Sequence, residues 1–115
     1  MGESFQFEAI LDGNLCKSLK DFLVNVGKSF NFPDYYGQNI DAFLECMNDL
    51  SWIDADHYHL TIVNFSHFLE LETQETRTEI FQYFNKIAEE WPNVPNSPGE
   101  EEYRRKATFE VEIVA

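Results

Sequence analysis

Residues 58–65 of this chain read YHLTIVNF, and this stretch decides which fold class the rest of the sequence fits. Its β-branched and aromatic residues predict a buried β-strand. On both sides of it the hydrophobic residues change to helical spacing, over residues 39–50 before it and residues 75–91 after it. A strand between amphipathic helices is typical of α/β proteins.

A further helix is predicted over residues 18–30, where Ser18 is a suitable N-cap residue. The Phe32–Pro33 pair ends this helix, because proline disfavours helical backbone in the residue before it. Asn39 is the corresponding N-cap of the helix that follows. The sequence therefore places two helices in front of the strand at residues 58–65.

Two more strands are predicted near the ends of the sequence. Residues 4–11, SFQFEAIL, alternate with Phe5 and Phe7 on the hydrophobic side, and residues 108–115, TFEVEIVA, alternate in the same way. The order strand, two helices, strand, helix, strand predicts an α/β fold. We expect a small three-stranded parallel sheet with flanking helices, joined by right-handed crossovers.

The length of 115 residues predicts a single domain, residues 1–115, with one hydrophobic core. Residues 92–107 hold three of the four prolines and a run of charged residues. This composition predicts an exposed loop within the domain.

The chain is strongly acidic. Lys and Arg number 8 and Asp and Glu 21, so the formal net charge is 8 − 21 = −13. Such a charge repels nucleic acids and anionic membranes and attracts basic proteins. It also favours a monomer in the free state.

Cys16 and Cys46 have no metal-binding spacing, and neither a signal peptide nor a membrane span is predicted, which indicates a cytoplasmic protein with free thiols.

Other chemistry finds little support in the sequence. His57, His59 and His67, with Asp54 and Asp56 nearby, lack the spacing that preassembles metal ligands. Glycine-rich phosphate-binding patterns and nucleophile motifs are also missing. We therefore expect no metal, no cofactor and no enzymatic activity.

The helix at residues 39–50 carries Asp41, Glu45 and Asp49 on the side that faces water, at about 100° per residue. Leu44 lies at the edge of this row. Like charges four residues apart repel, and a carboxylate in the last turn opposes the helix dipole, so helix stability does not explain Asp49. The row is either ordinary solvated surface or a surface that meets a cationic partner.

Residues 33–46, PDYYGQNIDAFLEC, resemble the barstar family of intracellular inhibitors of the ribonuclease barnase. The resemblance implies an inhibitor that occludes the active site of a basic ribonuclease with the second helix and the loop before it. The resemblance also implies that Glu45 takes the place of an RNA phosphate. The contact positions it implies, with Asp49 added from the acidic row, are Tyr35, Tyr36, Gly37, Asn39, Asp41, Leu44, Glu45 and Asp49.

The sequence departs from the family pattern at three of its contact positions. Leu44 replaces a tryptophan, Glu45 replaces an aspartate, and Lys86 stands where the family has an acidic residue. These departures favour a basic ribonuclease or nuclease-type toxin other than barnase as the partner. The alternative is an acidic interaction scaffold or regulator that kept the fold without inhibiting a nuclease.

Overall fold

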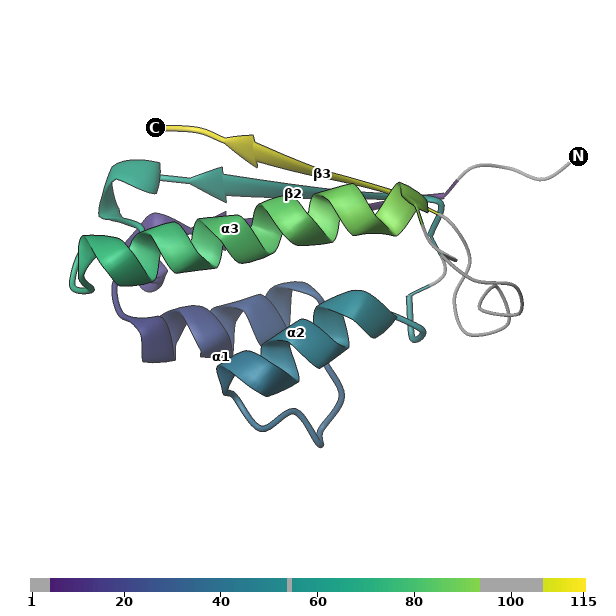
Figure 1. The fold of residues 1–115 in the computed structure, drawn as a ribbon, viewed down its shortest axis with the longest axis horizontal. Helices are drawn as coiled ribbons and strands as arrows, with labels where there is room; N and C mark the ends of the chain where they lie inside the picture. Colours follow the sequence, from purple (N-terminus) through teal and green to yellow (C-terminus); the bar gives the residue numbers. More distant parts are fainter. Residues whose placement is uncertain (1–4, 54, 94–106) are drawn as a thin grey trace, which may run out of the picture.

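The structure is a computed structural model that describes residues 5–53, 55–93 and 107–115 (Figure 1). Within these ranges three strands form one parallel sheet, which confirms the predicted α/β fold. The strands are β1 (Gln6–Asp12), β2 (His57–Val63) and β3 (Thr108–Ile113); the α-helices are α1 (Leu19–Ser29), α2 (Ile40–Asp49) and α3 (Gln74–Glu90); the 3₁₀ helices are η1 (Gly13–Leu15), η2 (Phe65–His67) and η3 (Trp91–Asn93).

The sheet has the strand order β1-β2-β3, and the three helices lie on one side of it (Figure 1). α1 lies against β1 and α3 lies against β3, whereas α2 packs against these two helices. α2 and the loop before it therefore lie on the side of the molecule away from the sheet.

The helix boundaries follow the N-cap residues that the sequence predicts. The side-chain oxygen of Ser18 accepts a hydrogen bond from the backbone N–H of Asp21 at 3.1 Å. Asn39 accepts in the same way from Ala42 at 2.8 Å. At the other end of α2, Leu50 adopts a left-handed backbone with φ of 49° and ends the helix.

Two further sequence predictions concern the loop at residues 92–107 and membrane spans. Of the loop predicted at residues 92–107, residues 94–106 lie outside the described residues. Among the helices of the described ranges, none is both long enough and apolar enough to cross a membrane.

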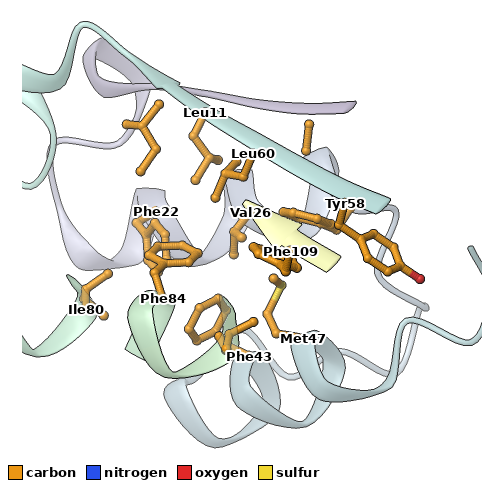
Figure 2. Packing of buried hydrophobic residues seen from close by; sticks show 14 of the residues in the cluster. Leu11, Phe22, Val26, Phe43, Met47, Tyr58, Leu60, Ile80, Phe84 and Phe109 are labelled. Atoms are coloured by element: carbon orange, nitrogen blue, oxygen red, sulfur yellow. The ribbon is translucent and has the colours of Figure 1, made fainter. Parts of the chain in front are cut away.

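Aromatic rings from all three helices meet in the core (Figure 2). Phe22 of α1 packs edge-on against Phe43 of α2 at 5.4 Å and against Phe84 of α3 at 5.9 Å, measured between ring centroids. Phe43 and Phe84 close the triangle at 5.7 Å. At the end of α3, the indole N–H of Trp91 donates to the carbonyl of Met47 at 3.0 Å, which ties α2 to α3 a second time.

Two predictions about the sheet are wrong. β2 is buried on one face only: Tyr58, Leu60 and Ile62 are buried, while the alternate residues such as His59 are half-buried. The reason is that all three helices cover the same face, although parallel sheets are usually covered on both. Phe5, predicted on the hydrophobic side of the first strand, is 53% exposed and precedes β1, which begins at Gln6.

The turn after β1 packs directly on the turn after β2. A Cβ atom on Gly13 would lie 2.1 Å from the backbone oxygen of Asn64, so only glycine fits without moving the backbone. The side-chain amide of Asn64 also donates to Asp12 at 2.9 Å. These contacts fix the position of η2 at this end of the sheet.

The open face of the sheet carries an ionisable cluster centred on β2. His59 Nδ1 lies 2.9 Å from a carboxylate oxygen of Glu8 on β1, and its Nε2 lies 3.0 Å from one of Glu112 on β3. Carboxylates only accept hydrogen bonds, so both contacts are satisfied only when the imidazole is protonated. Partial burial opposes protonation, but the hydrogen bond and charge of Glu8, with contributions from β3, outweigh it and raise the pKa of His59 above 6.5.

We expect His59 to stabilise the fold at mildly acidic pH. A pKa that is higher in the folded than in the unfolded chain stabilises the protein fully below the unfolded value and loses this effect as the pH rises through the folded value. Urea unfolding of wild type and His59→Gln at about pH 5.5 and about pH 8.5 measures this. The variant should lose about 0.5–1 kcal/mol relative to wild type at the lower pH only. An equal difference at both pH values would contradict the assignment.

Candidate partner-binding site

The buried side of α2 determines which of its residues face outward. Phe43 and Met47 are fully buried, and Asp41 and Glu45 lie exposed on the other side of the helix, as the helical spacing predicts. Asp49 is predicted to face water, but in the structure it is only half-exposed. The cause is the loop of residues 33–38, which folds back alongside this end of the helix.

Between that loop and α2 lies a hollow of about 120 Å³, which we call the acidic hollow. Its lining residues are Tyr35, Tyr36, Ala42, Glu45, Cys46 and Asp49. Four of the eight predicted contact residues therefore surround one space, and two of the four are carboxylates. A space of this volume is far larger than one water molecule requires and accommodates the head group of a partner side chain.

Tyr36 is held firmly by α1. Its hydroxyl donates to the backbone oxygen of Leu23 at 2.8 Å, and its ring packs edge-on against Phe32 at 4.7 Å. Gly27 makes room for the ring, since a Cβ there would lie 2.9 Å from a ring carbon. Burial, followed by the charge of Cys46, raises the pKa of Tyr36 to about 12. Tyr36 thus forms a fixed wall of the hollow.

The remaining loop residues differ in how free they are to contact a partner. Tyr35 is 75% exposed and projects beside the acidic hollow. Gly37 is exposed as well. Asn39 is exposed, but its side-chain oxygen is used by the N-cap bond to Ala42, which leaves it a structural role.

The acidic residues of α2, Asp41, Glu45 and Asp49, form no ion pair with a lysine, arginine or histidine in the part of the chain that the structure describes. Behind the hollow, burial and then the charges of Asp49 and Glu45 raise the pKa of the Cys46 thiol. The hollow is therefore suited to a cation rather than to thiolate chemistry.

Leu44 lies on the other side of α2, in a second hollow of about 100 Å³ that faces α3. Its lining residues are Leu44, Asn48, Tyr83, Lys86, Ile87 and Glu90. The hydrogen bond to Glu79, then burial, and then the charges of Glu79 and, least, of Asp41 raise the pKa of Tyr83, so Asp41 lies within electrostatic reach of this side. The acidic row is thus split, with Asp41 and Leu44 toward α3 and Glu45 and Asp49 toward the loop.

Sequence reasoning missed two residues that line the acidic hollow, Ala42 and Cys46. The available signal was their spacing, because positions 42, 45, 46 and 49 share one face of a helix. Elsewhere in the described residues, no group of three or more His, Cys, Asp or Glu side chains is arranged to hold a metal ion. Asp54, considered with this chemistry above, lies outside those residues.

A family model described as Barstar (barnase inhibitor) matches residues 6–113 of the chain. The chain belongs to the barstar family. The matched range begins at the first residue of β1 and ends at the last residue of β3, so the likeness seen in residues 33–46 extends over the whole sheet. The barstar family consists of ribonuclease inhibitors, whose partner is a ribonuclease and which are not themselves enzymes.

The two neighbouring tyrosines of the loop should respond differently to loss of the hydroxyl group. Tyr36→Phe removes the hydrogen bond to Leu23 and should lower the free energy of unfolding by about 1 kcal/mol. Tyr35→Phe is the matched control, and because this side chain is 75% exposed it should leave stability unchanged. Urea unfolding measures both variants. Equal stability of the two would show that the Tyr36 hydroxyl does not hold the loop.

Proposed function

We propose that this chain inhibits a basic ribonuclease by placing α2 and the loop of residues 33–38 over the active site of the enzyme. The observation that supports this most directly is the acidic hollow. Two carboxylates, Glu45 and Asp49, lie on one small space beside an exposed tyrosine, and no cation of the described residues pairs with them. An isolated domain gains nothing from leaving such charges together.

The chemistry of the target follows from these carboxylates. Ribonucleases bind the phosphates of RNA, for which arginine is well suited because its planar guanidinium offers paired donors. A carboxylate such as Glu45 accepts the same pair of hydrogen bonds, so it takes the place of a phosphate without offering a bond to cleave. The ring of Tyr35 is free to stack on the same guanidinium. The enzyme is thus occupied and RNA is excluded.

The net charge of the chain also favours association with a basic ribonuclease. The net charge of −13 attracts a basic enzyme before contact and opposes nonspecific binding to RNA. Since carboxylates on α2 lack cationic partners among the described residues, this side of the molecule is well placed to lead the approach.

Lys86 narrows the range of possible targets. It lines the same hollow as Leu44, directly beside the outward face of α2. A partner that covers α2 therefore meets one lysine among the carboxylates. We infer that the matching position of the target is neutral or acidic, which disfavours an enzyme whose surface is cationic throughout.

Replacing Glu45 tests the inhibitory surface. Glu45→Gln keeps the size of the side chain but removes its charge, and inhibition should weaken at least about tenfold because charge-assisted hydrogen bonds to guanidinium are lost. Glu75→Gln on α3 is the matched control, since it is an exposed glutamate outside both hollows of α2 and changes the net charge equally. Inhibition is measured as cleavage of a fluorescent RNA by a basic ribonuclease that the wild-type chain inhibits.

Two outcomes of this experiment would contradict the proposal. One is equal inhibition by Glu45→Gln and wild type, provided that urea unfolding shows both to be folded. The other is a wild-type chain that inhibits none of the basic ribonucleases of its own host, which would favour the scaffold alternative.

Salt should affect the association rate more than the dissociation rate. Screening shortens the reach of the net charge, whereas close contacts in a desolvated interface are screened less. We therefore expect the association rate constant to fall several-fold between about 20 mM and about 150 mM salt in stopped-flow experiments, with a smaller change in dissociation. An association rate that does not depend on salt would show that the net charge does not guide the encounter.

A further inference from the structure

A third hollow, of about 380 Å³, lies between η2 and the first half of α3, and we call it the Arg77 hollow. Its lining residues are Phe65, Ser66, Phe68, Gln74, Arg77, Thr78 and Phe81. It shares no residue with either hollow beside α2. The proposed inhibition therefore leaves this space unused.

The walls of the Arg77 hollow are aromatic. Phe65 and Phe81 pack edge-on at 5.1 Å between ring centroids, and each also contacts Phe68. Phe68 in turn is buried and packs against Phe22 of the core at 5.6 Å. From α3 come positions 74, 77, 78 and 81, whose spacing places them on one face of the helix.

The backbone around η2 is fixed by contacts with several elements. The N–H of Phe65 donates to Val114 at 3.1 Å, and the N–H of Leu69 donates to Cys16 at 2.8 Å. The close approach of Gly13 to Asn64 also holds this turn in place. A ligand would meet walls that are already in place, which reduces the entropy lost on binding.

Arg77 is, among the residues that the structure describes, the only charged one that lines this hollow. It is half-buried, and although the chain has 21 aspartates and glutamates, none of those in the described residues forms an ion pair with it. A guanidinium group has five N–H donors and no acceptor. The site thus combines aromatic walls with unused donors for an anion.

We propose that the Arg77 hollow binds a small aromatic carboxylate, with its ring against Phe65 and Phe81 and its carboxylate on Arg77. The volume lies in the range of small-molecule sites. A carboxylate matches the paired donors of the guanidinium, and the hydroxyls of Ser66 and Thr78 offer further donors nearby. The net charge of −13 opposes the dianion of a phosphate ester more than it opposes a monoanion.

The probe that tests this is 2-naphthoate, titrated into the full chain labelled with ¹⁵N and followed by NMR. We expect saturable shifts concentrated at residues 65–68 and 74–81. The uncharged analogue 2-naphthamide should bind at least about tenfold more weakly, since it lacks the charge-assisted bonds. Arg77→Gln should weaken binding of 2-naphthoate by a similar factor. Lys86→Gln, which removes a cation elsewhere on α3, is the matched control and should bind as wild type does.

Three results would overturn the proposal. The first is the absence of saturable shifts in these two segments. The second is equal affinity for 2-naphthoate and 2-naphthamide, a comparison that needs only the wild-type chain and so does not depend on the folding of Arg77→Gln. The third is tighter binding of 2-naphthyl phosphate than of 2-naphthoate, which would assign the hollow to phosphate esters instead. Each of these leaves the proposed inhibition through α2 unaffected.

Discussion

The arrangement of this molecule depends on the edge-on contacts among Phe22, Phe43 and Phe84, one from each α-helix. α1 and α3 lie on the sheet, but α2 is placed by packing on those two helices. Aromatic pairs of this kind contribute about 0.5–1.5 kcal/mol each beyond the area that they bury. The position of α2, and with it the acidic hollow, is therefore set by these ring contacts and the hydrogen bond from Trp91 to Met47 rather than by hydrogen bonds to the sheet.

With this arrangement, the outward-facing residues of α2 are not needed to hold the helix in place. Phe43 and Met47 supply the burial that the helix needs, and the N-cap at Asn39 closes its first turn. The positions between them are consequently open to residues that oppose helix stability, such as a carboxylate in the last turn. Asp49 stands at such a position. A carboxylate at this position agrees with the proposed binding of a cationic partner and is not required by the fold.

The sequence was sufficient to predict the elements and their order, because N-caps and hydrophobic spacing are local signals. Ser18 and Asn39 mark helix starts for reasons found within four residues of each. The family resemblance in residues 33–46 also located the candidate site. Long-range contacts were beyond such reasoning. The half-burial of Asp49 depends on how the loop folds back, and the fixed position of Tyr36 depends on Gly27 in a different helix. The one-sided burial of β2 was equally hidden, since β-branched residues occupy both of its faces.

The two acidic surfaces of the molecule, the open face of the sheet and α2, differ in whether nearby groups balance their charge. On the open face of the sheet, Glu8 and Glu112 meet His59, so part of their charge is balanced whenever the imidazole is protonated. On α2 no such group meets Glu45 within the described residues. Both surfaces belong to one acidic chain, but within the described parts of the chain the carboxylates of α2, unlike those of the sheet, have no ion-pair partner. A cationic enzyme that approaches the molecule thus gains more from α2 than from the sheet, and this difference grows as the pH falls toward the range in which His59 is charged.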